Sequence, residues 1–455
     1  MSKRFNSMKK LALHWKIIIG MILGIIIGFV AVIIDNRTGS ESNTLKRIVI
    51  DYIKPFGTIF INGLKLIAVP LIVASLVKAI SDMKDISKLS KLGGRTLITY
   101  IATTVVAVII GMVLVNLIKP GEFIPLEIRE SLSLQYQEAA QGKIEVALSQ
   151  KETGPLQALI DLVPSNIFEA ASENKNMLQV IFFAILFGIG IILSAPEKTK
   201  TVKDFFDNLN EVVLKIIDLI MIYSPLGVFA LMASLVAENP DPGIFAGLGM
   251  YSLTLLLGLA IMIFGVYPLL VYIFTGKKYG FFFSGIGPAQ LVAFTTSSSA
   301  ATLPVTMERV EEHLGVKKEA ASFILPIGAT VNMDGTSCYQ AVAAIFIAQA
   351  FDIDLSIGAQ LGIILTATLA SIGAAAVPSA GIIMLVIVLG QAGIPEAGIA
   401  LIFAVDRPLD MCRTVVNVTG DAAVSMIVAK STGQLGDPKV KDWDDHYNKE
   451  NTATN

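Results

Sequence analysis

Charged residues are scarce in this sequence. Only 16% of its 455 residues are Asp, Glu, Lys or Arg, whereas 54% are hydrophobic, and the mean hydropathy is +0.69. Soluble domains carry about a quarter charged residues, so this composition excludes an ordinary soluble globular protein. The net charge is −2 and no long basic tract is present, so nucleic acid is not predicted as a partner.

Cysteine and histidine are also rare. The two cysteines, Cys338 and Cys412, both fall in apolar segments, which argues against a disulfide framework or a paired-cysteine metal site. The three histidines, His14, His313 and His446, fall in loops or at the ends of apolar runs. A zinc or iron centre is therefore not expected, and no motif predicts an organic cofactor.

Long apolar runs dominate what is present. A helix needs about 20 mainly apolar residues to cross a bilayer, and such runs fall near residues 14–35, 47–80, 94–118, 177–194, 210–237 and 245–275. The weak alternation typical of barrel strands is absent. The sequence therefore predicts an all-α polytopic membrane protein. Its first run, "IIIGMILGIIIGFVAVII", is too long for the core of a signal peptide and is read as the first span.

The distribution of basic residues predicts the orientation. Lys and Arg favour the cytoplasmic side, and five of them precede or begin the first span: Lys3, Arg4, Lys9, Lys10 and Lys16. Further basic residues fall on alternate turns, at 84–95, 198–203 and 277–278. We therefore expect both termini in the cytoplasm, with the Glu-containing segment 119–176 outside and 437–455 as a polar tail.

The C-terminal third contains one pattern twice. The apolar segments 279–307 and 355–392 are interrupted by "TTSSSAATLP" and "ASIGAAAVPSAG", and each precedes a segment with Asn and Asp, "NMDGT" at 332–336 and "NVTGD" at 417–421. Broken helices in corresponding positions of two halves point to a transporter site built from inverted repeats. Re-entrant hairpins would satisfy the interrupted backbone. Two ordinary helices kinked at Pro304 and Pro378 remain the alternative.

The last apolar segment carries a polar stripe. At about 100° per residue, six polar residues fall within an arc of roughly 100°: Asp406, Asp410, Arg413, Thr414, Asn417 and Asp421. The five charges between 401 and 428 would cost on the order of 10–15 kcal/mol if they were unpaired in lipid. This helix must therefore face partners, ions or water.

The residue types in these segments suggest a ligand. Arg413 offers a planar fork of donors for a carboxylate, and Asp410 can accept an ammonium group, which together suggest an amino acid with a second carboxylate. Backbone N–H groups and hydroxyls of the first serine-rich motif can receive a carboxylate. The oxygens of Asp334 and Asp421, with the nearby amides and hydroxyls, suit a hard cation, and in a membrane transporter sodium is expected.

The four motifs "SSSAATLP", "NMDGT", "ASIGAAAVPSAG" and "DMCRTVVNVTGD", in this order, resemble those of the glutamate transporter family, the dicarboxylate/amino acid:cation symporters. The resemblance implies a homotrimer in the plasma membrane, with eight transmembrane helices, two re-entrant hairpins and an elevator mechanism. It implies these domains: 1–80, scaffold spans one and two; 81–118, third span of the transport domain; 119–244, extracellular segment and scaffold spans four and five; 245–436, sixth span, both hairpins and the seventh and eighth spans of the transport domain; 437–455, tail.

The same resemblance implies the site residues. The substrate, an acidic amino acid, would be bound by Ser298, Ser299, Thr336, Val377, Gly381, Asp410, Arg413, Thr414 and Asn417. Asp410 would hold its amine and Arg413 its side-chain carboxylate. Co-transported sodium would be bound in three places: by Gly328, Asn332, Asp334, Asn417 and Asp421; by Thr330, Ser371, Ile372 and Ala374; and by Tyr100, Thr103 and Thr104.

Departures within the family favour one substrate class. Neutral amino acid members lack an arginine at the position of Arg413, and proton-coupled dicarboxylate members lack the "NMDGT" and "NVTGD" pattern. Many relatives carry a further arginine where Ser297 or Met411 stands here. The alternatives are a proton-coupled C4-dicarboxylate carrier, an ion channel, or an intramembrane serine hydrolase, which lacks a suitable His or Lys near the serines.

Overall fold

A computed structural model of the chain describes residues 13–38, 44–81, 92–130, 132, 163–172, 176–238, 243–372 and 380–438. Within these ranges the regular structure is helical, and the one extended pairing is an isolated bridge between Val316 and Leu435. The predicted all-α class is therefore confirmed. Of the sequence-predicted site residues, Val377 and Ala374 lie outside the described ranges, as does most of the segments 119–176 and 437–455.

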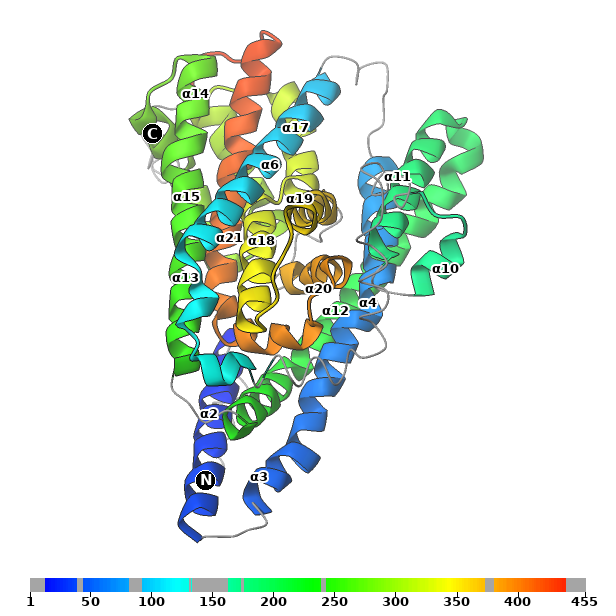
Figure 1. The fold of residues 1–455 in the computed structure, drawn as a ribbon. Helices are drawn as coiled ribbons and strands as arrows, with labels where there is room; N and C mark the ends of the chain where they lie inside the picture. Colours follow the sequence, from blue (N-terminus) through cyan, green and yellow to red (C-terminus); the bar gives the residue numbers. More distant parts are fainter. Residues whose placement is uncertain are drawn as a thin grey trace, which may run out of the picture.

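One group of helices comes mainly from the N-terminal half of the chain. Its members pack on one another along the right and lower side of Figure 1. They are α2 (Leu13–Thr38), α3 (Thr44–Ile48), the π-helical turn Val49–Ile53, α4 (Lys54–Ser81), α10 (Ile167–Ser172), α11 (Met177–Leu193) and α12 (Pro196–Glu238). Glycines allow α2 to approach α12 closely: a Cβ on Gly24 would lie 2.4 Å from the Phe229 carbonyl oxygen. Small residues serve helix packing in this way in membranes.

The second group surrounds one buried helix, α18 (Asp334–Ala350). Nearly all residues of α18 are buried, and it contacts α6 (Leu92–Ile118), α13 (Gly243–Ala260), α19 (Ile357–Ile372), α20 (Ala380–Ala392) and α21 (Ile399–Ser431). The remaining members are η2 (Pro120–Phe123), the π-helical turn Ile261–Val266, α14 (Tyr267–Thr275), α15 (Tyr279–Thr296), α16 (Ser299–Glu308), the π-helical turn Arg309–His313, α17 (Lys318–Val331) and η7 (Glu396–Gly398). A helix that is apolar and buried all round forms a core, and α18 is the axis of this group.

The first interrupted segment is a hairpin and not a kinked helix. The chain breaks at Ser297 and Ser298, between α15 and α16, while Pro304 lies inside α16. The Arg309 side chain donates hydrogen bonds to the carbonyls of Gly285 (2.7 Å) and Ser284 (3.1 Å), so the chain returns to the end where it entered. The segment is therefore a helical hairpin.

The second interrupted segment follows a similar course. Helices α19 and α20 contact each other, and the segment between them, 373–379, lies outside the described residues together with Pro378. After α20 the chain reaches Gly398, where a Cβ would lie 2.2 Å from Ile347. Ile347 is near the end of α18, shortly before α19 begins, so this segment also leaves close to where it entered.

Length and hydropathy identify fewer spans than the eight expected. Among the described residues, four helical stretches are long and apolar enough to cross a membrane, or five if the bent pair Pro196–Ile217 and Ile222–Glu238 is one span. The charges of α21, the shortness of α11 and the break between α17 and α18 keep the other segments from meeting such a test. These three segments therefore fail the length and hydropathy test because of their own charge, length or interruption.

Two details differ from the sequence-based expectation. Residues Lys198, Lys200 and Lys203 lie in the first turns of α12 and not in a loop, and α12 bends by 46° between its two halves. The "NMDGT" segment is not one continuous span, because the helix is interrupted at Asn332 and Met333. Both errors arise because apolar periodicity does not report where a helix begins or breaks.

The two groups of helices meet along α4 and α20. Phe60 of α4 packs edge-on against Phe403 of α21 with ring centroids 5.0 Å apart. The Lys65 ammonium of α4 forms an ion pair with Glu396, just before α21. Contacts between the groups are therefore made by few side chains, whereas α4 and α12 pack along much of their length (Figure 1).

We predict that Gly24→Ala destabilises the protein, because its methyl group would meet the backbone of Phe229 and neither helix can move without repacking. The expected cost is about 1–3 kcal/mol, as for other overpacked sites, and it is measured as a lower midpoint of thermal unfolding in detergent. Gly249→Ala in α13 is the matched control, since nothing lies within 4 Å of its added Cβ. Equal midpoints for the two variants would contradict the close packing of α2 on α12.

Candidate functional site

The first hairpin tip presents serines in a strained turn. Ser297 closes α15 in the left-handed conformation (φ 51°), and its buried hydroxyl has no hydrogen-bond partner among the described residues. Ser298 caps α16 by accepting a hydrogen bond from the Ala301 N–H at 3.2 Å. Ser298 and Ser299 are both buried. The tip thus combines the first N–H groups of α16 with hydroxyls, which suits an anionic group.

A second irregular segment lies between α17 and α18. Asn332 and Met333 leave the helical conformation, and both are buried. Asn417 of α21 holds this segment: its side-chain oxygen accepts a hydrogen bond from the Gly335 N–H at 2.8 Å, and its amide nitrogen lies 3.3 Å from the Met333 sulfur. The backbone here is irregular where protein groups surround it, as is required at membrane depth.

The charged stripe of α21 forms a closed network around Arg413. The Arg413 guanidinium is fully buried and donates to Asp406 at 2.8 Å and to Asp410 at 2.7 Å. Arg407 donates to the other oxygen of Asp410 at 3.0 Å. The ring of Tyr339 from α18 stacks under the guanidinium, with 3.8 Å between its centroid and the guanidinium carbon. Two carboxylates and two guanidiniums therefore neutralise one another.

Other predicted substrate residues gather around this network. A Cβ on Gly381, in the first turn of α20, would lie 3.7 Å from an Arg413 nitrogen and 3.2 Å from Thr336. The Asn417 amide lies 3.5 Å from the Thr336 hydroxyl. The Thr414 hydroxyl is buried and donates to the Asp410 carbonyl at 3.0 Å. Residues from α18, α20 and α21 thus meet at one place.

Asp334 forms the first of two carboxylate clusters. It is fully buried, and its oxygens accept hydrogen bonds from the hydroxyls of Thr104 (2.6 Å) and Tyr267 (2.7 Å). Thr103, one residue earlier on α6, is buried and donates to the Tyr100 carbonyl. Asp334 and Thr104, which the resemblance assigns to separate cation groups, are therefore in direct contact.

Asp421 forms the second carboxylate cluster. Its Oδ1 accepts a hydrogen bond from the Asn332 side chain at 2.9 Å, while the buried Asn332 Oδ1 has no partner among the described residues. Gly328 lies against the same group: a Cβ there would be 2.3 Å from the Tyr100 hydroxyl and 2.5 Å from Asp421 Oδ1. Four groups converge here: the Asp421 carboxylate, the Asn332 amide oxygen, the Tyr100 phenol and the backbone of Gly328, which no side chain covers. Such a set of oxygen ligands suits a hard cation.

The predicted cation group around Thr330 and Ser371 is less closely assembled. The Thr330 hydroxyl bonds to carbonyls of its own helix, Ile327 at 3.0 Å and Pro326 at 3.4 Å. Ser371 is buried and bonds to the Thr368 carbonyl at 2.8 Å. Helices α17 and α19 touch, and Ile372 ends α19, but Ala374 lies outside the described residues.

Sequence reasoning missed three participants. Tyr267 and Tyr339 were hidden among the aromatic residues of apolar helices, and no local signal distinguishes a tyrosine whose hydroxyl or ring contacts a charge. Asp406 stood in the polar stripe but was not assigned to a site, although it bonds to Arg413 as directly as Asp410 does. Its position seven residues before Arg413, two turns away, is a usable signal.

The chain was compared with known proteins. The model of the sodium:dicarboxylate symporter family matches residues 13–431. The chain belongs to this family. It is 34% identical to the proton/sodium-glutamate symport protein of Geobacillus stearothermophilus over 96% of this chain and 98% of that protein. It is 38% identical to the excitatory amino acid transporter 3 of Oryctolagus cuniculus over 94% of this chain and 87% of that protein.

Membership in the sodium:dicarboxylate symporter family decides several questions. The chain is an integral membrane transporter, a cation-coupled symporter of the glutamate/dicarboxylate class, and not an enzyme. The intramembrane hydrolase alternative is therefore wrong. The buried His313 Nε2 lies 2.7 Å from an Arg309 guanidinium nitrogen.

We predict that Gly328→Ala weakens cation binding in this symporter, because its methyl group would displace the Tyr100 hydroxyl or the Asp421 carboxylate. The measurement is the rise in unfolding temperature when sodium chloride replaces choline chloride at equal concentration. We expect at least a tenfold higher sodium concentration for half of the effect, about 1.4 kcal/mol. Gly362→Ala in α19, with nothing within 4 Å, is the control and should match the unmodified protein. A wild-type sodium response in Gly328→Ala would remove this cluster from cation binding.

Proposed function

We propose that this chain is a sodium-coupled symporter of acidic amino acids, L-aspartate or L-glutamate, across the plasma membrane. The observation that carries the proposal is the closed network around Arg413, a fully buried guanidinium that donates to two carboxylates within a site formed by α18, α20 and α21. The relatives named as glutamate and excitatory amino acid transporters support the substrate class.

The network suggests how an acidic amino acid would bind. Its side-chain carboxylate can take the place of Asp410 on the Arg413 fork, since both present the same oxygens to a guanidinium. Its ammonium then takes Asp410, which is left without one of its donors. Breaking the pair without such replacement would leave a buried charge uncompensated, at a cost of several kcal/mol. The site therefore favours a ligand that carries both groups.

The backbone carboxylate of the ligand also needs partners. The Ser298–Ser299 tip offers N–H groups and hydroxyls, and the Ser297 hydroxyl has no partner among the described residues. Thr414 and Asn417 lie on the same face of α21 as Asp410, one and two turns further on. They are assigned to the polar atoms of the ligand, with Thr336 and Gly381 closing the site; Val377, which the resemblance also implies, lies outside the described residues.

Charge balance supports coupling to cations. The Asp406, Arg407, Asp410 and Arg413 network is neutral, so an acidic amino acid adds one net negative charge to a region that already holds Asp334 and Asp421. Among the described residues these two carboxylates are bonded to hydroxyl and amide groups and not to a basic side chain. Cations bound there offset the charge of the substrate, and at membrane depth such compensation is worth several kcal/mol.

Sodium is favoured over the proton by the ligand set. A proton needs one carboxylate, whereas the Asp421 cluster adds a phenol, an unpartnered amide oxygen and a bare backbone, which a sodium ion would use together. The second candidate is a proton-coupled carrier of dicarboxylates. The relative from Geobacillus stearothermophilus is named a proton/sodium-glutamate symport protein, so coupling to protons has to be tested as well.

The two groups of helices support an elevator mechanism. All assigned site residues belong to the group around α18, and that group meets the other mainly where α20 packs on α4 and α21 packs on α12, with the Lys65–Glu396 ion pair beside them. The first group is assigned as the scaffold of a homotrimer and the second as the transport domain that crosses the membrane. Basic residues at the ends of α14 and α21 and the start of α6 support a cytoplasmic position for that end.

Uptake into proteoliposomes tests the proposed function. We expect labelled L-aspartate or L-glutamate to accumulate when a sodium gradient is imposed, and accumulation to fall at least tenfold when choline replaces sodium. A proton gradient without sodium serves as the second arm. Equal uptake in the absence of sodium, or uptake driven by the proton gradient alone, would replace the proposal by the proton-coupled carrier.

We predict that Arg413→Cys abolishes uptake of acidic amino acids, because Asp406 and Asp410 lose their shared donor and the substrate carboxylate loses the guanidinium assigned to it. The loss should exceed a hundredfold in apparent affinity, about 3 kcal/mol or more. Uptake of a neutral amino acid such as serine in the variant would show that the fold survives. Arg37→Cys, at the exposed end of α2, is the control, and unchanged aspartate affinity in Arg413→Cys would refute the assignment.

A further inference from the structure

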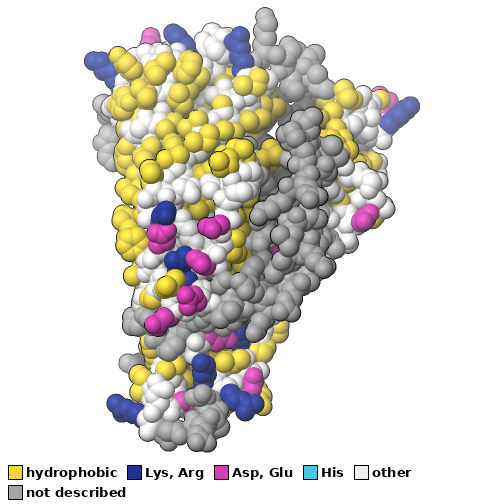
Figure 2. Space-filling view, viewed as in Figure 1, with side chains coloured by type: hydrophobic (Ala, Val, Ile, Leu, Met, Phe, Trp, Pro, Cys, Tyr) yellow, Lys and Arg dark blue, Asp and Glu magenta, His cyan; other side chains and the backbone are white. Residues whose placement is uncertain are grey.

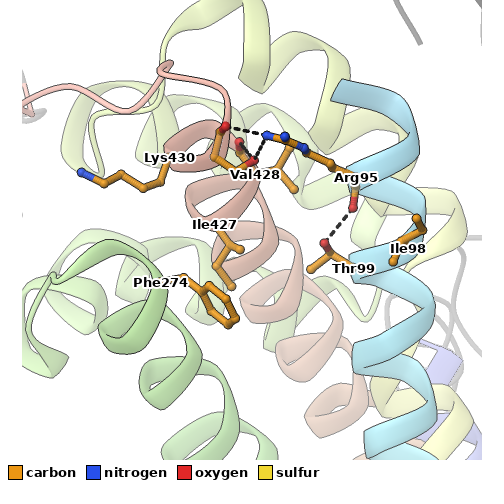
Figure 3. A pocket seen from close by; sticks show the side chains of 8 residues that line it. Arg95, Ile98, Thr99, Phe274, Ile427, Val428 and Lys430 are labelled. Atoms are coloured by element: carbon orange, nitrogen blue, oxygen red, sulfur yellow. Dashed lines mark hydrogen bonds between the residues drawn. The ribbon is translucent and has the colours of Figure 1, made fainter. Parts of the chain in front are cut away.

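A groove lies where α6, α14 and α21 meet, far along α21 from the Arg413 network. Its volume is about 260 Å³, and it opens to the surface of the molecule (Figure 3). Most of its wall is apolar, with Ile98, Phe274 and Ile427 among the lining residues. Ile98 and Phe274 are 70% and 57% exposed, so these apolar side chains face out of the protein. The groove therefore continues onto an apolar outer surface.

Two cationic side chains line this groove, and in Figure 3 they extend to opposite sides of the last turn of α21. Arg95, in the first turn of α6, donates through one nitrogen to the carbonyl (2.5 Å) and the hydroxyl (3.0 Å) of Ser431, as Figure 3 shows. A guanidinium has five N–H donors, so three remain for a ligand. Lys430, in the last turn of α21, is exposed and has no ion-pair partner among the described residues. The residues that line the groove include no Asp or Glu.

The position of the groove matches the boundary of a membrane. Lys277 and Lys278 follow directly after α14, and Lys277 forms a loose ion pair with Asp437 at 3.8 Å. Figure 2 shows Lys and Arg side chains at this upper end of the molecule, above a broad band of hydrophobic side chains. A cationic rim above an apolar band is the arrangement expected where lipid head groups meet hydrocarbon.

We propose that this groove binds one anionic phospholipid of the bilayer. Its phosphate is held by Arg95, its head group extends toward the exposed Lys430, and an acyl chain runs past Phe274 and Ile98 onto the exposed apolar surface. The positive charge of Arg95 and Lys430 complements a negative head group. A phospholipid fits the groove better than a small soluble anion does, because such an ion would leave the apolar wall exposed to water. The proposal is independent of which substrate and ion the protein transports.

Lipid titration of the purified protein tests this site. Native mass spectrometry of the full chain in detergent would count bound phosphatidylglycerol and phosphatidylcholine that carry identical acyl chains. We expect phosphatidylglycerol to bind at least about fivefold more tightly. The variant Arg95→Ala/Lys430→Ala should lose about tenfold or more of that affinity, since each basic residue near an anionic surface contributes a severalfold factor. The charge-matched control Arg37→Ala/Lys198→Ala, on α2 and α12, should bind as the unmodified protein does.

A single substitution separates lipid binding from a folding defect, which the double variant could cause because Arg95 also bonds to the end of α21. Lys430→Gln leaves both Arg95 hydrogen bonds in place and should still bind phosphatidylglycerol severalfold more weakly. Equal binding of the two lipids, or equal binding by Lys430→Gln and the unmodified protein, would overturn the proposal. Displacement of phosphatidylglycerol by millimolar inorganic phosphate would overturn it in favour of a site for free anions.

Discussion

Charge inside the membrane-embedded part of α21 has to be neutralised by protein, because each unpaired charge at such depth costs about 2.5–3.5 kcal/mol. Arg413 is the centre of that neutralisation, bonded to Asp406 and Asp410 and stacked on Tyr339. The requirement brings α18 and α21 into contact and leaves irregular backbone at Asn332 and Met333 surrounded by polar groups. The proposed ligand meets the same requirement, because its carboxylate would replace Asp410 on Arg413 while Asp406 stays bonded.

The same constraint links the substrate region to the cation region. Asn417 holds the Gly335 N–H beside the network and, through its carbonyl, contacts the Asn332 side chain that bonds to Asp421. The proposed substrate and cation groups therefore share Asn417 and the interrupted segment between α17 and α18. In the proposed scheme, a ligand that shifts this segment would alter both places, so coupling would follow from a short path of hydrogen bonds and not from a long-range change. The groove at Arg95 and Lys430 lies outside this path, at the far end of α21.

Sequence reasoning reached much of this site. The stripe of polar residues on α21, the interrupted segment at Ser297 and Ser298 and the two Asn/Asp motifs each gave a local signal, because polar groups in apolar runs are costly and rare. The resemblance supplied Tyr100, Thr103, Thr104 and Gly328, which composition does not single out. Neither the local signals nor the resemblance identified Tyr267 and Tyr339. An aromatic residue in an apolar helix gives the same sequence pattern whether it contacts a carboxylate, a guanidinium or only hydrocarbon.

By itself the sequence determined that this chain is helical and lies in a membrane, because apolar runs of spanning length admit no other backbone there. It also determined that the last helix needs partners, because that follows from charge and depth alone. Which partners, however, was decided by tertiary structure: Arg413 stacks on Tyr339 of α18, Asp334 meets Thr104 and Tyr267 from two other helices, and Gly328 meets Tyr100. Those contacts join residues up to hundreds of positions apart, and periodicity along one helix carries no information about the neighbour it faces.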